Sequence, residues 1–187
     1  SRLTVESNKK AVVDGHIELE MVDTVTYKDD SIVMSRMGEL VIFDSFGINK
    51  GRFQVPYGSI LRVVHGAKVQ KGDVLFEWDP YNSPIISNVS GKVQFLDLQE
   101  NATFRVEKDE VTDVESWIII SDKRGKRRPA VSIIDASGNK VGHYMMPDGA
   151  ILAVSDKAEV TIGQTLAKLP RAVGKTRDIT GGLPRVA

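Results

Sequence analysis

The chain has 187 residues, 41% of them hydrophobic and 27% charged, so it can form one large or two small globular domains and is too apolar to be disordered. Its 25 basic and 25 acidic residues cancel, which argues against nucleic-acid binding as the main activity of the whole chain. The lack of cysteine excludes disulfides, thiolate metal sites and cysteine nucleophiles and fits a reducing cytoplasm, and no apolar run reaches the length of a membrane span.

The N-terminal segment, Ser1 to Lys10, is polar and has no apolar core of a signal peptide. It also lacks an initiator methionine. We therefore expect a fragment or a processed product.

Alternation of apolar and polar residues predicts strands along most of the chain, as in 17–21, where Ile17, Leu19 and Met21 alternate with glutamates. Unbroken apolar runs at 117–120 and 131–134 are typical of buried strands. Turn signals containing glycine recur about every ten residues, which favours a sandwich or barrel. No long amphipathic helix is found, and the pattern predicts an all-β fold.

An internal repeat links the two halves of the chain. At an offset of 91, Pro56 falls on Pro147 and Gly58 on Gly149, and the matches run without a gap from Ile42 to Leu75 in the first copy. At an offset of 76, the segment 13–17 resembles 89–93. The second copy therefore carries about fifteen extra residues, which we expect between 99 and 128.

Two copies with a period this long indicate tandem modules rather than a solenoid. The predicted organisation is an N-terminal linker over 1–11, one β module over 12–83, a second over 84–171 and a C-terminal arm over 172–187.

Each module contains the pattern P-x-G-x-I-L-x-V followed by V-x-x-G-x-x-L, which resembles the hammerhead of biotinyl and lipoyl carrier domains. Such carriers place a modifiable lysine at a hairpin tip, usually beside methionine. The lysines nearest the turns are Lys68, Lys71 and Lys157, and none has a methionine neighbour. A carrier or accessory module of a multidomain enzyme is the alternative interpretation, and a scaffold of the same shape is preferred.

No catalytic or metal site is predicted. His16, His65 and His143 lie in separate segments without the spacing of metal ligands. The acidic residues of 107–115 lie in polar sequence, which is typical of a solvated loop rather than of a buried carboxylate pair. We expect no cofactor in this chain.

One basic run lies among the extra residues of the second module. Two interpretations stay open: a solvated hairpin tip, or a loop that contacts phosphates or a partner protein. No aromatic residue is interleaved, so base stacking is not indicated. The candidate contact residues are Lys123, Arg124, Lys126, Arg127 and Arg128.

The segment 178–186, D-I-T-G-G-L-P-R-V, resembles the C-terminal arm of the trigger loop in the β′ subunit of bacterial RNA polymerase. In that family a lineage-specific insertion interrupts the trigger loop, and the chain resembles this insertion along nearly its full length. The arm residues are Thr180, Gly181, Gly182, Leu183, Pro184, Arg185 and Val186. The other matching stretches are V-P-Y-G at 55–58, W-D-P at 78–80, V-S-G at 89–91, R-P-A at 128–130 and I-D-A-S-G-N at 134–139.

The resemblance implies two tandem sandwich-barrel hybrid modules that are attached to the trigger loop, modulate its folding and so influence elongation and pausing. The family's nucleotide-contacting residues and its magnesium-binding aspartates lie upstream of this chain, so the resemblance implies no catalysis by the fragment itself. The implied partners are other polymerase subunits and β′ elements, with downstream DNA as a further candidate. The isolated fragment is expected to be a cytoplasmic monomer.

Overall fold

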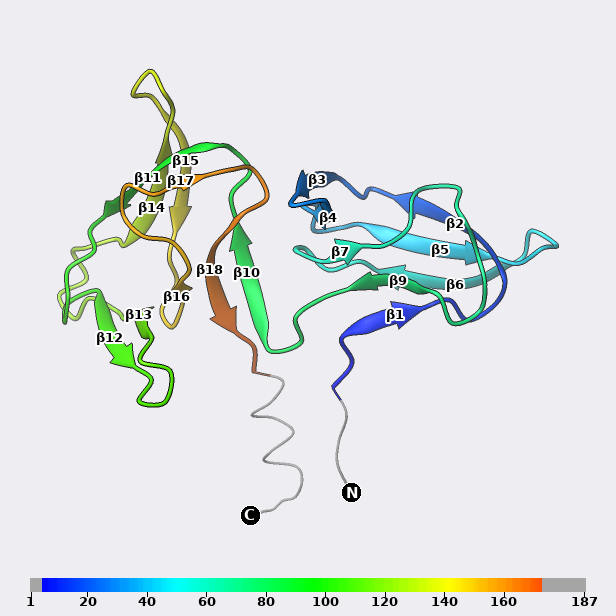
Figure 1. The fold of residues 1–187 in the computed structure, drawn as a ribbon, viewed down its shortest axis with the longest axis horizontal. Helices are drawn as coiled ribbons and strands as arrows, with labels where there is room; N and C mark the ends of the chain where they lie inside the picture. The colour runs from blue at the N-terminus through cyan, green and yellow to red at the C-terminus, as the bar shows by residue number, and fades with distance from the viewer. Residues whose placement is uncertain (1–4, 173–187) are drawn as a thin grey trace, which may run out of the picture. The chain divides into compact units, whose positions relative to one another are not determined.

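The computed structural model describes residues 5–172, and every regular element within this range is a β-strand (Figure 1). The prediction of an all-β fold is confirmed. Within residues 5–172 the strands pair antiparallel, in four sheets. The chain divides into two compact units, Ser1–Pro80 and Tyr81–Ala187.

The described residues of the first unit form nine strands. They are β1 (Asn8–Lys10), β2 (Gly15–Glu20), β3 (Thr24–Tyr27), β4 (Asp30–Val33), β5 (Glu39–Phe43), β6 (Asn49–Gln54), β7 (Ile60–Leu61), β8 (Lys68–Val69) and β9 (Val74–Glu77). A five-stranded sheet has the order β1-β9-β7-β4-β3, and a four-stranded sheet has the order β6-β5-β2-β8.

The second unit repeats this arrangement. Its strands are β10 (Asn82–Ile86), β11 (Gly91–Leu96), β12 (Phe104–Lys108), β13 (Glu115–Ile119), β14 (Ala130–Ile134), β15 (Lys140–Met145), β16 (Ile151–Leu152), β17 (Glu159–Val160) and β18 (Thr165–Pro170). The sheet orders are β10-β18-β16-β13-β12 and β15-β14-β11-β17. Adding nine to each strand number of the first unit reproduces the second, so the sequence repeat is a repeat of topology.

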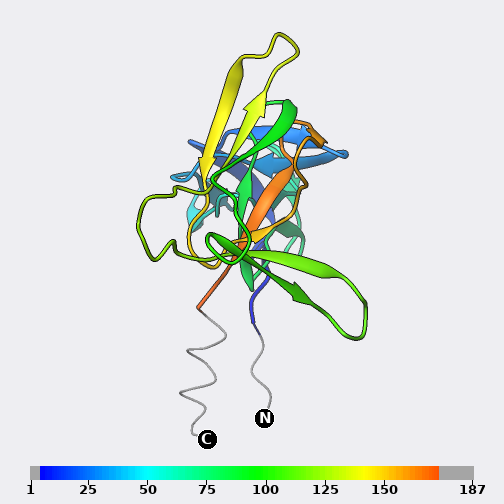
Figure 2. The same ribbon diagram turned by 90° about the vertical axis from the view of Figure 1, so that its left-hand side faces the viewer.

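The strand registers show where the second copy is longer. The offset between equivalent residues is 76 in β2 and β11, 80 in β3 and β12, 86 in β4 and β13, and 91 from β5 and β14 onward. Four, six and five residues are thus added in three successive connections. The β12–β13 hairpin, clear in Figure 2, is the second of these additions.

The equivalent strands β1 and β10 lie at edges of their sheets and have little sequence likeness. The segment 1–11, expected to be a linker, contains β1, and Ala11 is buried in the first core. The boundary expected between 83 and 84 falls inside β10, whereas the units divide after Pro80.

Each unit buries its own hydrophobic core at equivalent positions. Ile17 and Val93 correspond, as do Leu75 and Leu166, and all four are almost fully buried. The buried phenylalanine is Phe76 on β9 in the first core but Phe104 on β12 in the second. The two cores therefore share a plan and differ in which strand supplies the large side chain.

A glycine as the first residue of β2 and of β11 is required by the close approach of a neighbouring strand. A Cβ atom on Gly15 would lie 1.8 Å from the carbonyl oxygen of Phe43, and one on Gly91 would lie 2.5 Å from that of Ile134. No side chain fits at these distances, which explains why both copies of the repeat keep glycine here.

Candidate functional site

The basic run lies in a loop that is held in shape by one aspartate. Asp122 Oδ1 accepts a hydrogen bond from the backbone N–H of Arg124 at 3.1 Å, and Oδ2 accepts from those of Lys126 at 3.1 Å and Arg127 at 2.8 Å. The hydrogen bond from Arg127 is the largest cause that lowers the pKa of Asp122, and those from Arg124 and Lys126 add to it. Asp122 therefore stays ionised and organises the run without exposing its own charge.

The other end of this loop is fastened to an added segment of the same unit. Asp97 Oδ2 accepts a hydrogen bond from the backbone N–H of Arg128 at 2.9 Å. The backbone N–H of Ile120 donates a hydrogen bond to the carbonyl oxygen of Thr103 at 2.9 Å. Thr103 is itself buried, and its hydroxyl donates to the carbonyl of Asp97 at 2.7 Å. The lengthened β11–β12 and β13–β14 connections are thus joined to each other by hydrogen bonds.

The structure presents most of the predicted contact side chains to solvent. Arg127 is half-buried, with a guanidinium nitrogen 3.8 Å from Asp122 Oδ2. The other four basic residues are exposed and form no ion pair within residues 5–172: Lys123, Arg124, Lys126 and Arg128. This concentration of unpaired positive charge is suited to contact with phosphates or with an acidic protein surface.

The three histidines do not converge. His16 stacks on Phe43 with ring centroids 5.3 Å apart, and His65 Nδ1 accepts the backbone N–H of Leu19 at 2.9 Å. His143 Nδ1 lies 3.1 Å from the hydroxyl of Ser132, its cross-strand neighbour. Ser132 is fully buried within β14, so this Ser–His pair has no room for a substrate. Within residues 5–172 no group of three or more His, Asp and Glu side chains is arranged to hold a metal ion.

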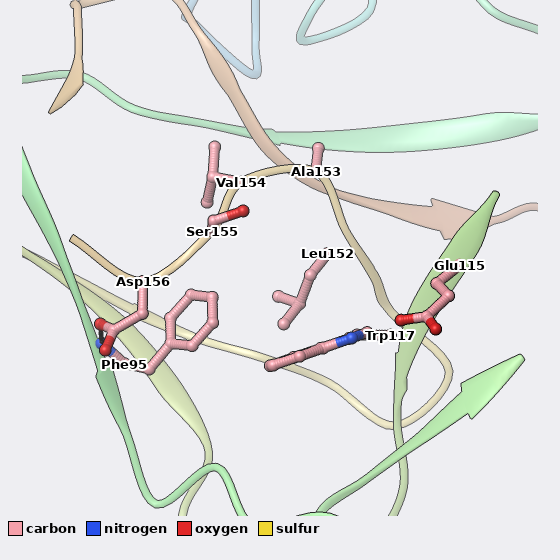
Figure 3. A pocket seen from close by; sticks show the side chains of 8 residues that line it. All are labelled: Phe95, Glu115, Trp117, Leu152, Ala153, Val154, Ser155 and Asp156. Atoms are coloured by element: carbon pink, nitrogen blue, oxygen red, sulfur yellow. Dashed lines mark hydrogen bonds between the residues drawn. The ribbon is translucent and has the colours of Figure 1, made fainter. Parts of the chain in front are cut away.

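A pocket on the second unit was not predicted. It has a volume of about 380 Å³ and is lined by Phe95, Glu115, Trp117, Leu152, Ala153, Val154, Ser155 and Asp156. Figure 3 shows the side chains of Phe95, Leu152 and Trp117 converging, with the Glu115 carboxylate beside the indole edge and Asp156 beside Phe95. Asp156 Oδ1 accepts the backbone N–H of Phe95 at 2.9 Å.

Trp117 corrects the expectation that 117–120 is a buried run. Only Ile119 of β13 is fully buried, and Trp117 is 36% exposed. The reason is that β13 lies next to the sheet edge, where alternate residues face outward. Phe104 stacks on the indole with ring centroids 4.3 Å apart, and Phe95 lies 6.0 Å away. An apolar run does not reveal which of its residues face outward, so the sequence could not single out Trp117.

The predicted arm residues 180–186 lie outside the described residues. No helix in the described part of the chain is long and apolar enough to cross a membrane.

Comparison with known proteins gives a consistent result. No protein-family model matches the chain. Over its full length, however, the chain is 42% identical to a DNA-directed RNA polymerase subunit β′ from Parabacteroides distasonis, 38% to one from Methylococcus capsulatus and 42% to one from Colwellia psychrerythraea. The chain belongs to the family of DNA-directed RNA polymerase β′ subunits. It spans 14% of the length of these relatives, which fits an internal segment of β′. The resemblance recognised in the sequence is confirmed at the level of this subunit.

Proposed function

We propose that the chain is a non-catalytic insertion of the β′ subunit that changes the folding equilibrium of the trigger loop, and through it elongation and pausing. The full-length similarity to β′, of which the chain spans 14%, carries this proposal. The placement in the trigger loop rests on the likeness of 178–186 to the C-terminal arm of that loop. In this proposal the parent enzyme is the cytoplasmic, magnesium-dependent nucleotidyltransferase.

Two folded units attached to a loop act on it through their own contacts. If the units contact the polymerase differently when the loop is folded and unfolded, they shift its equilibrium by the difference in contact free energy. A difference of about 1.4 kcal/mol changes the folded-to-unfolded ratio tenfold. No chemical group in the units is needed for this effect.

The basic loop at 123–128 is the surface we assign to contact with polymerase elements or downstream DNA. It has four exposed cations without an ion pair within the described residues, on a backbone fixed by Asp122. A fixed loop loses less conformational entropy on binding than a mobile one.

The test is a polymerase from which residues 8–171 are deleted and replaced by a short glycine-serine linker. We expect pause lifetimes and elongation rate to change while nucleotide addition persists, because the catalytic groups lie elsewhere in β′. A matched enzyme that retains the units but carries Gln at 123, 124, 126 and 128 separates the basic loop from the rest. Unchanged pausing and elongation in the deleted enzyme would overturn the proposal.

A further inference from the structure

We propose that the pocket formed by Phe95, Trp117 and Leu152 binds an arginine or lysine side chain from a basic, partly apolar segment of a partner protein. This inference deepens the proposed function by naming a partner chemistry for the second unit. It concerns a surface separate from the basic loop, with the opposite charge.

The shape and lining of the pocket suit a long cationic side chain. Its volume of about 380 Å³ is at the small end of the range for ligand pockets, which fits one side chain better than a whole cofactor. Phe104 covers one face of the Trp117 indole without lining the pocket, so the rest of the ring can contact a side chain bound in the pocket. An aromatic face attracts a guanidinium or ammonium group, and Leu152 and Val154 offer apolar surface to its methylene stem.

The charges at the pocket have the sign that this occupant needs. Glu115 lines it, and its carboxylate has no hydrogen bond or ion pair within the described residues. Asp156 also lines it and uses Oδ1 for the backbone of Phe95. A carboxylate beside an aromatic ring provides both a charge-assisted hydrogen bond and a ring contact for one guanidinium.

The neighbouring β12–β13 hairpin is, like the pocket, both acidic and partly apolar. Residues 107–115 contain five acidic residues and one lysine. Two valines near its tip, Val111 and Val114, are 94% and 58% exposed. Acidic and apolar groups in one hairpin complement a segment in which basic and apolar residues are mixed.

The first unit shows that the fold does not require this pocket's composition. By strand register, Trp117 corresponds to Ser31 and Phe95 to Leu19. Ala153 corresponds to Arg62, whose guanidinium is paired with Glu77 at 2.7 Å and Asp30 at 3.3 Å. The same topology thus forms with a serine in place of the tryptophan, so the topology by itself does not require Trp117, which is 36% exposed beside the half-buried Phe95.

A nucleic-acid base is the other occupant that an exposed tryptophan suggests. Proteins that stack bases combine aromatic side chains with a positively charged groove. Here the lining carries two carboxylates and no cation, and the adjacent hairpin is acidic. Phosphates would be repelled, so a protein segment is favoured.

The test is NMR titration of the 187-residue chain with the capped pentapeptide Leu-Arg-Leu-Arg-Leu and with its twin Leu-Gln-Leu-Gln-Leu. The chain has two tryptophans, so the indole N–H signal of Trp78 is an internal control for that of Trp117. We expect a saturable shift of the Trp117 signal with the arginine peptide and about tenfold weaker binding of the glutamine peptide.

Two single-charge variants provide the matched comparison. Glu115→Gln keeps the pocket's shape and is expected to lower the affinity for the arginine peptide about tenfold. Glu110→Gln, on the same hairpin but outside the lining, is expected to change this affinity less than about twofold. Trp117→Ser, the residue of the first unit, is expected to abolish binding, with unchanged amide signals of β11 and β18 as the check on folding.

Equal binding of both peptides, no saturable shift, or a larger Trp117 shift with a thymidine oligonucleotide would each overturn the inference. These outcomes concern binding to the isolated chain and leave the result of the deletion in the polymerase standing. The two proposals therefore fail independently.

Discussion

Asp122 Oδ2 accepts the backbone N–H of Arg127 at 2.8 Å and lies 3.8 Å from the guanidinium of the same residue. A single carboxylate thus fixes both the path of the basic loop and the direction of one of its cations. Because of this contact, the run of five basic residues has an ordered backbone, as a binding surface requires and a loosely solvated hairpin tip does not.

Replacing Asp122 should therefore loosen the loop without unfolding the unit. In Asp122→Ala three backbone N–H groups lose their acceptor, and we expect trypsin to cleave within 123–128 several times faster than in the original chain. Asp109→Ala is the control, because it removes a comparable acceptor from the β12–β13 hairpin instead. Equal cleavage of the loop in both variants would contradict the role assigned to Asp122.

Acid should release the same loop, and the sign follows from the lowered pKa. Hydrogen bonds from Arg127, then Arg124 and Lys126, lower the pKa of Asp122 in the folded chain below the ordinary value of 3.8 that the unfolded chain retains. The stabilisation is complete above the unfolded value and is lost as the pH falls through the lower folded value. We expect the Arg127 amide signal to hold its position through the ordinary aspartate range and to move only at lower pH. A carboxyl titration midpoint for Asp122 at or above the ordinary aspartate value would contradict this.

Asp44 in the first unit is the companion measurement in the same titration. Its pKa is lowered first by the backbone hydrogen bond from Ile48, and further by the one from Phe46 and by the charge of Lys50. The amide signal of Ile48 should therefore also hold its position until the pH falls below the ordinary aspartate range.

The two cores should respond separately to equivalent truncations. Leu75 and Leu166 are fully buried at corresponding positions, so Leu75→Ala and Leu166→Ala should each cost about 2–5 kcal/mol. Hydrogen exchange should show the loss of protection in the strands of the altered unit alone. Equal loss in both units would mean that they unfold as one cooperative body.

The close strand approach at Gly15 predicts a large cost for one added methyl group. Gly15→Ala brings a Cβ to 1.8 Å from the Phe43 carbonyl oxygen and should destabilise the first unit by more than the usual cost of overpacking, about 1–3 kcal/mol. Gly47→Ala is the control, because its Cβ meets nothing within 4 Å and the cost is limited to the left-handed backbone, about 1–2 kcal/mol. Denaturant unfolding of the two variants provides the comparison, and a Gly15→Ala cost no larger than that of Gly47→Ala would refute the steric argument.

The basic loop should bind duplex DNA weakly and with strong salt dependence if phosphates are its partners. Gln at 123, 124, 126 and 128 should weaken binding to a duplex of about 20 base pairs and flatten the plot of log affinity against log salt by about 0.9 for each phosphate that the loop no longer neutralises. Gln at Lys68, Lys71, Lys92 and Lys140 removes the same charge from exposed positions elsewhere. Fluorescence anisotropy measures both, and equal effects of the two variants would assign binding to net charge rather than to the loop.

The sequence by itself was sufficient for the all-β class, the repeat and the β′ family. Alternation, glycine turns and matched aliphatic positions are local signals, and Gly15 and Gly91 recur because backbone contact leaves no space for a side chain. The position of the added residues was also predicted closely, although they divide among three connections, the first of which follows β11.

Only the tertiary structure decided what these residues do together. In the sequence Asp122 is one of many charged residues, whereas in the structure its carboxylate oxygens accept hydrogen bonds from three backbone N–H groups of the basic run. Trp117 appeared to belong to a buried strand until β13 was found next to the edge strand β12, where its indole meets Phe95 and Leu152 from other strands. Strand order and register bring these distant residues together, and no spacing along the chain encodes which face of an apolar run will meet solvent.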